Sequence, residues 1–270
     1  WRMYTLNVVF LAFITFVLRL MPIFLFWVFS CVGFWHVNLV SELRDVPPPI
    51  GDAVGDFGPH LFVCFVIWHV VLQHVWYAFE HVPLEFGIAW LGLWWIGVLL
   101  DVVFANVPLQ RLTYHDISQQ PGAVTSIVII VIVVVVLAIN QVRVVRSVGL
   151  LPKYLALYVV FGIVLALCAA VPGEGLRLHH YVIALILLPG CAFPTRISLL
   201  CCAILFGMYI NGVARWGFDG ILQDNGVIQG DATGNSLLPS FSSNMTTDGV
   251  IKWNPIPVSY THLLAHETSL

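Results

Sequence analysis

The sequence predicts an all-α, polytopic transmembrane helix bundle. Of its 270 residues, 60% are hydrophobic and only 9% are charged, and the mean hydropathy is +0.94. These values lie far outside those of soluble globular domains. Apolar runs of about 20 residues, the length that a helix needs to cross a bilayer, recur as far as residue 219. A net charge of -3 gives no reason to expect nucleic-acid binding.

Eight apolar segments are candidates for membrane spans. The first two belong to one stretch, which Arg19 and Pro22 interrupt, because proline disfavours continuation of a helix and arginine seeks the interface. If this stretch forms one kinked helix, the count is seven. The segments are Tyr4–Leu18, Ile23–Val40, His60–Phe79, Leu84–Val107, Ala123–Asn140, Tyr154–Val171, His179–Leu188 with its flanks, and Ser198–Trp216.

The basic residues predict the orientation of these spans. The loop Gln141–Lys153 carries three of them, so we expect it in the cytoplasm. Counting from this loop places the acidic loop Ser41–Pro59 and both termini outside. Asn244 begins an Asn-Met-Thr glycosylation sequon, which is useful only outside the cytoplasm. We therefore expect a multi-pass glycoprotein of the plasma membrane or the endomembrane system.

Three regions follow from composition. Residues 1–219 are the predicted bundle, and residues 220–257 are a polar extracytoplasmic linker rich in Gly, Ser, Asn and Asp. Residues 258–270 look like translated cDNA-library adapter, and the start at Trp1 leads us to expect a fragment of a longer protein. The six cysteines lie in or beside apolar runs without CxxC spacing, so we interpret them as buried thiols.

Five ionisable side chains fall at one depth, near the external ends of their spans. Histidine nitrogens and a carboxylate are suitable zinc ligands, and a catalytic zinc site keeps one position for water. The five are therefore a candidate ligand or metal vestibule. The alternative is interfacial hydrogen bonding, because polar groups gather at helix ends in any case. These residues are His36, His60, Asp101, His179 and His180.

The third span carries a polar stripe. His69, Gln73, Tyr77 and Glu80 recur at helical spacing on one face, and His74 and His81 follow a neighbouring face. We expect the stripe to point into the bundle, since polar groups facing lipid are costly. Interhelical hydrogen bonding and a proton or ion relay are both compatible with it. Haem ligation by His69 or His74 is a further alternative, which is disfavoured because the deeper histidines all lie on one span.

The last span ends in a second polar set. Asn211, Arg215 and Asp219 are spaced by four residues, so one helix face would hold all three. An interfacial ion pair between Arg215 and Asp219 is the simplest expectation. Asp101 should pair with Arg215, a histidine or a backbone donor.

Several separated motifs resemble the membrane region of fungal LCCL-domain-containing proteins, over about residues 1–257. They are Gly33-Phe34-Trp35-His36-Val37, Pro47-Pro48-Pro49 with Gly55-Asp56-Phe57, Ile139-Asn140-Gln141-Val142-Arg143, Leu176-Arg177-Leu178-His179-His180-Tyr181, and Asn211-Gly212-Val213-Ala214-Arg215-Trp216-Gly217-Phe218. The resemblance implies an extracytoplasmic LCCL domain upstream and a β-rich domain that residues 249–257 would enter. It carries over no catalytic residue.

Three functions remain open at this point. The first is a non-enzymatic membrane anchor or scaffold for the protein's own upstream and downstream external domains, with a vestibule for a ligand or lipid and no cofactor. The second is a zinc-dependent lipid hydrolase that uses the external histidines and Asp101. The third is an ion- or proton-coupled transporter that uses the stripe from His69 to Glu80.

Overall fold

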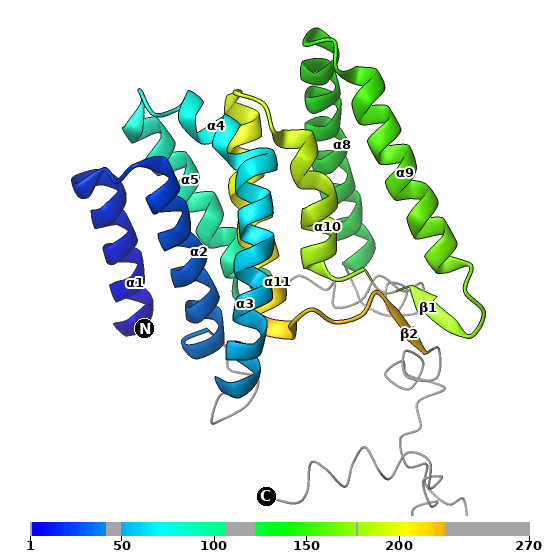
Figure 1. Ribbon diagram of the computed structural model, residues 1–270, viewed down its shortest axis with the longest axis horizontal. Helices are drawn as coiled ribbons and strands as arrows, with labels where there is room; N and C mark the ends of the chain where they lie inside the picture. The colour runs from blue at the N-terminus through cyan, green and yellow to red at the C-terminus, as the bar shows by residue number, and fades with distance from the viewer. Residues whose placement is uncertain (1, 42–49, 106–121, 177, 225–270) are drawn as a thin grey trace, which may run out of the picture. The chain divides into compact units, whose positions relative to one another are not determined.

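The computed structural model describes residues 2–41, 50–105, 122–176 and 178–224. Within them the chain is almost entirely helical (Figure 1). The predicted helical fold is therefore confirmed, while the number of membrane crossings stays a prediction. Among the described residues, five helices are long and apolar enough to cross a membrane: Pro22–Leu39, Ile50–Ala78, Ala123–Ser147, Leu151–Ala169 and Arg196–Trp216. Three apolar helices are shorter: Arg2–Leu18, Pro83–Val98 and His180–Cys191.

The elements follow one another as a series of helices with one short strand pair. Two helices contain a π-helical turn, at Ile14–Leu18 after α1 and at Trp68–Leu72 between α3 and α4. A 3₁₀ turn, Leu188–Cys191, follows α10. The bounds are α1 (Arg2–Phe13), α2 (Pro22–Leu39), α3 (Ile50–Ile67), α4 (Gln73–Ala78), α5 (Pro83–Val98), α6 (Leu100–Val103), α8 (Ala123–Ser147), α9 (Leu151–Ala169), β1 (Glu174–Leu176), α10 (His180–Leu187), α11 (Arg196–Trp216) and β2 (Leu222–Asp224).

Helix ends follow local chemistry. Pro22 and Pro83 occupy the first positions of α2 and α5, where a missing N–H costs nothing and the fixed φ suits a helix. The Thr195 hydroxyl accepts a hydrogen bond from the Ser198 N–H and caps α11. Gly217 ends α11 with φ 71°, a conformation that side-chain-bearing residues rarely adopt.

The break between the first two spans is confirmed as two separate helices. Arg19 adopts a left-handed φ of 47°, and Pro22 restarts the chain as α2. Elsewhere the predicted bounds need correction. Helix α3 begins at Ile50, so part of the loop expected over Ser41–Pro59 is helical and Pro59 lies inside a helix. The fourth span ends at Val98 rather than at Val107, because α5 breaks before the short α6.

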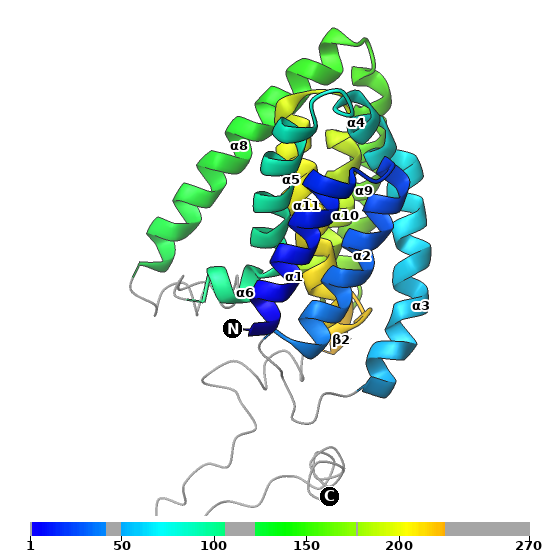
Figure 2. The same cartoon turned by 90° about the vertical axis from the view of Figure 1, so that its left-hand side faces the viewer.

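Helix α11 forms the centre of the bundle and packs against α5, α10, α2 and α3 (Figures 1 and 2). It crosses α5 where two glycines meet. A Cβ added to Gly207 would lie 2.9 Å from the Gly97 Cα and 2.8 Å from the Val98 nitrogen. Small residues allow this close backbone approach, which is the usual way for apolar helices to gain van der Waals contact in a membrane.

An aromatic core fills the space around α11. Phe26 stacks on Phe206 with ring centroids 5.2 Å apart, and the rings of Trp76 and Trp90 lie 4.6 Å apart in a T-shaped pair. These tryptophans are buried rather than interfacial. They therefore contribute packing between helices and not anchorage at the membrane surface.

Helices α8 and α9 contribute little to this core. On α8, residues 128–136 are all exposed, and only Ala123, Gln141 and Val145 are buried. Helix α9 has no buried residue. Such an apolar exterior is typical of a helix that faces lipid.

The chain divides into two compact units, residues 1–167 with 177–221, and residues 168–176 with 222–270. In the second unit β1 and β2 pair antiparallel, with Gly175 opposite Gln223. The remainder of the predicted linker, from residue 225 to residue 257, and the adapter-like tail lie outside the described residues, as do Asn244 and Pro47-Pro48-Pro49.

Candidate functional site

The motif at the start of α10 meets the motif at the end of α11. Tyr181 packs against Gly212, where an added Cβ would lie 3.0 Å from the Tyr181 Cβ. The Tyr181 hydroxyl donates a hydrogen bond to the Asp219 carbonyl oxygen. Sequence reasoning assigned no role to Tyr181 or Gly212, although both lie within the quoted motifs. Their contact fixes the start of α10 to the end of α11.

Two side chains on one face of α11 contact the segment where α5 ends and α6 begins. The Asn211 amide donates to the Val98 carbonyl at 2.9 Å, and this carbonyl lies where α5 ends. One helical turn later, the Arg215 guanidinium lies 3.2 Å from the Asp101 carboxylate. Asn211 and Arg215 therefore share one face of α11, as expected. Asp101 pairs with Arg215, which is one of its expected partners.

The expected ion pair between Arg215 and Asp219 is wrong. Helix α11 ends at Trp216 and Gly217 turns the chain away, so Asp219 does not continue the helical face. Arg215 pairs with Asp101 instead. These two side chains are partly buried, with 19% and 25% of their surface exposed, so their attraction is less screened than at an open surface.

His36 is buried between α1, α2 and α5. The Asn7 amide donates to its Nδ1 at 2.8 Å, which leaves the proton on Nε2 when the ring is neutral. The rings of Tyr4 and Trp95 pack edge-on against it at 4.7 and 4.9 Å. This polar pair holds α1 against α2, and sequence reasoning missed Asn7, a single amide in an apolar run.

His60 has a different set of neighbours. Its Nε2 lies 3.0 Å from the Ser30 hydroxyl, which also lies 3.0 Å from the Cys64 thiol. The ring stacks between Phe34 and Tyr209 at 4.8 and 5.6 Å. All five side chains are fully buried. Serine and cysteine are chemically weak signals in an apolar sequence, so this network between α2, α3 and α11 could not be found from spacing.

The two adjacent histidines diverge at the start of α10. His179 precedes the helix in extended conformation, is half-buried and stacks on Tyr181 at 5.9 Å. His180 opens the helix and is exposed. Among the described residues, no group of three or more His, Cys, Asp and Glu side chains could hold a metal ion. The structure therefore places His36, His60, Asp101 and His179 in separate contacts.

The polar stripe of the third span lies on the outer face of the bundle, which corrects the expected orientation. His69, His74, Glu80 and His81 are exposed, and Tyr77 has 48% of its surface exposed. The opposite face of the same helix carries the buried Trp68, Leu72, Val75 and Trp76. A larger apolar and aromatic area on that face outweighs the polar stripe in deciding which side packs inward.

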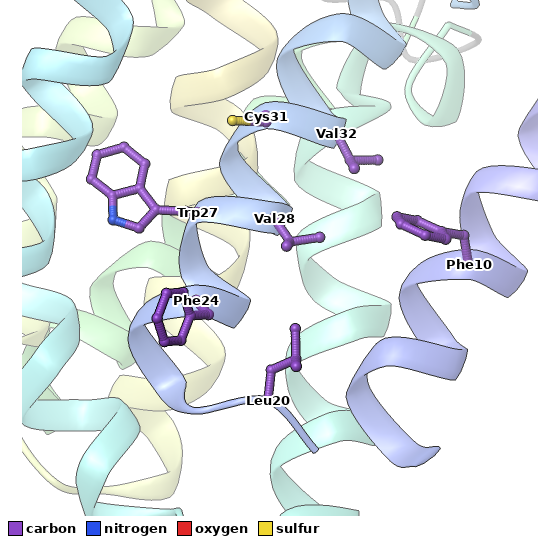
Figure 3. A pocket seen from close by; sticks show the side chains of 7 residues that line it. All are labelled: Phe10, Leu20, Phe24, Trp27, Val28, Cys31 and Val32. Atoms are coloured by element: carbon purple, nitrogen blue, oxygen red, sulfur yellow. The ribbon is translucent and has the colours of Figure 1, made fainter. Parts of the chain in front are cut away.

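A pocket of about 530 Å³ lies between α1 and α2 (Figure 3). Phe10 faces Val28 and Val32 across it. Its lining is apolar and includes none of the five predicted vestibule residues. The lining residues are Phe10, Leu20, Phe24, Trp27, Val28, Cys31 and Val32.

At the opposite end of α5, Glu85 and Arg196 form an exposed ion pair between the first turns of α5 and α11.

All six cysteines are free thiols, and four of them are buried, as predicted, whereas Cys31 and Cys168 are only partly buried. The Ser198 hydroxyl donates to the Gln141 side-chain oxygen at 3.1 Å and so connects α11 to α8.

No family model matches the chain, and no solved structure matches it. The chain is similar to a protein of Saccharomyces cerevisiae named "Uncharacterized protein YIL067C". The two are 31% identical over 242 residues, which cover 85% of this chain. The chain spans about a third of the length of that curated relative, 35%. The relative's name assigns no activity.

Proposed function

We propose that the chain is the membrane region of an LCCL-type protein, a multi-pass anchor that holds external domains on one side of the membrane. The observation that carries this proposal is the use of the polar groups. Asn7 with His36, Asn211 with the Val98 carbonyl, and Asp101 with Arg215 each join neighbouring helices. Polar side chains that bond to a neighbouring helix stabilise the bundle, and these three pairs do not converge on a common reaction centre.

The proposed anchor crosses the membrane eight times and has both termini outside. The parallel arrangement of α5 and α11 supports this count. Glu85 and Arg196 join the beginnings of the two helices, and Asp101 and Arg215 join their ends. The fourth and eighth crossings of a chain must run in the same direction, so these contacts agree with three crossings between them.

The relative's length supports the proposal that further domains belong to such a protein. The alignment covers 35% of the relative, which leaves ample length outside the membrane region. The external domains themselves remain part of the proposal.

Glycosylation tests the orientation. In fungal microsomes, the full chain should carry an endoglycosidase-sensitive glycan that an Asn244→Gln variant lacks. A sequon inserted at the turn around Gly149, between α8 and α9, should remain unmodified because that turn lies next to Arg143 and Arg146. Modification at the inserted site would contradict the orientation, and with it the external position of both termini.

Metal content tests the anchor against the hydrolase. Protein purified in detergent without a histidine tag should contain no stoichiometric zinc, and a His179→Ala/His180→Ala variant should give the same result. Stoichiometric zinc that disappears in the variant would overturn the anchor and favour metal-dependent chemistry at the external end.

A further inference from the structure

The outer face of the helix Ile50–Ala78 carries polar groups where a membrane offers no partner, and the turn after it adds Glu80 and His81. From His69 to His81 the exposed side chains include three histidines, Tyr77 and Glu80. The Gln73 amide turns back to the carbonyl of His69 within its own helix. Within the described residues, the side chains of His74, Glu80 and His81 have no hydrogen bond or ion pair.

This arrangement is costly if lipid covers it. Polar side chains within membrane spans almost always face the protein interior or water, because hydrocarbon cannot satisfy them. His69 lies inside the helix Ile50–Ala78, about two and a half turns from its nearer end. A protein surface that supplies hydrogen bonds would remove the cost, whereas lipid would not.

We propose that a second copy of this chain covers the stripe and forms a symmetric dimer in the membrane. This rests on the membrane embedding proposed above and goes beyond the anchor function. A two-fold axis along the membrane normal brings each residue close to its own counterpart at the same depth. Such an interface must be self-complementary, and this stripe meets that requirement.

The complementarity lies in adjacent donors and acceptors. Glu80 and His81 are neighbours at one end of the stripe, so Glu80 of each copy can face the partner subunit's His81, and the contact forms twice. Further into the span, the side chains of His69, Gln73 and Tyr77 each carry both a donor and an acceptor and can bond to themselves across the axis. The exposed Phe65 and Val70 flank them and provide packing area.

The mass of the protein in lipid nanodiscs or mild detergent tests the dimer, by native mass spectrometry and by light scattering across a dilution series. We expect a dimer for the full chain. A His69→Leu/Gln73→Leu/Tyr77→Phe variant should weaken association about tenfold or more. Because these changes make the face more apolar, the monomer should insert and unfold cooperatively as before. Thr125→Val, at an exposed polar position of α8, is the matched control and should leave the dimer intact.

Exchanging the roles of Glu80 and His81 shows whether a variant loses the dimer contact or loses its fold. Glu80→Lys should weaken the dimer because it removes the carboxylate that accepts from the partner subunit's His81, and Glu80→Lys/His81→Glu should restore it by exchanging the two roles. A monomeric full chain at every concentration would overturn the proposal, as would a triple variant that dimerises normally. Neither outcome bears on the glycosylation pattern, so the orientation can fail or hold independently.

Discussion

At the scale of single residues, the motif at the end of α11 is a set of contacts with neighbouring helices. Asn211 donates to the carbonyl at the end of α5, Gly212 leaves room for the backbone and Cβ of Tyr181, and Arg215 pairs with Asp101. Gly217 then ends the helix with a positive φ. Asn211, Gly212 and Arg215 thus each contact a neighbouring helix. A motif that looks chemical in sequence is explained here by helix packing.

The glycine crossing gives a direct prediction. Gly207→Ala adds a methyl group 2.8 Å from the Val98 nitrogen, which is backbone and must shift, so the helices should separate. Overpacking of this kind costs about 1–3 kcal/mol. Thermal unfolding of the purified protein should show the loss. Gly92→Ala on α5, where nothing lies within 4 Å, is the control and should not lower the melting temperature.

At the scale of helices, the predictable features were those encoded by local chemistry. The break between α1 and α2 follows from Pro22, and the start of α5 follows from Pro83. The early start of α3 at Ile50 was missed because Asp, Gly and Pro in that segment are typical of loops. The π-helical turn at Trp68–Leu72 has no comparable sequence signal.

The stripe shows a different limit. Spacing established that His69, Gln73 and Tyr77 share a face, but periodicity does not say which face is buried. That choice depends on what α2, α5 and α11 present to the helix, and Trp68 and Trp76 fit the aromatic core. The pairing of Asp101, in contrast, was predictable. An isolated carboxylate in an apolar run needs a cation or a hydrogen-bond donor.

The end of the α5–α11 pair allows a quantitative test at this scale. A double-mutant cycle with Asp101→Asn and Arg215→Gln should give a coupling energy of about 0.5–1 kcal/mol, because the pair is partly exposed. Reversible unfolding in mixed micelles measures the four free energies of unfolding. A cycle with no coupling would contradict the ion pair, and Arg143→Gln on α8 serves as an unrelated charge control.

At the scale of the whole molecule, the helices contribute unequally. The first compact unit has its centre at α11, which packs against α2, α3, α4, α5 and α10, and the large buried aromatics surround it. Helix α8 has only three buried side chains, and one of them, Gln141, is hydrogen-bonded to Ser198 of α11. Helix α9 has none buried. Stability should therefore reside in α2–α5, α10 and α11, with α8 and α9 as a lipid-facing addition.

Removing α8 and α9 tests this division. Joining Gly122 to Ala170 deletes two crossings, so the orientation of every later helix is preserved in the proposed topology. The deletion also removes no tryptophan, since all ten lie elsewhere in the sequence, and eight of them belong to the remaining described helices, so their fluorescence reports that bundle. Ser198 keeps its hydrogen bond with Thr195 when Gln141 is lost. We therefore expect a cooperative fluorescence transition within about 2–4 °C of the parent, corresponding to about 1 kcal/mol for the lost bond. Loss of the cooperative transition would show that α8 and α9 carry part of the fold, and the bundle around α11 would then be insufficient by itself.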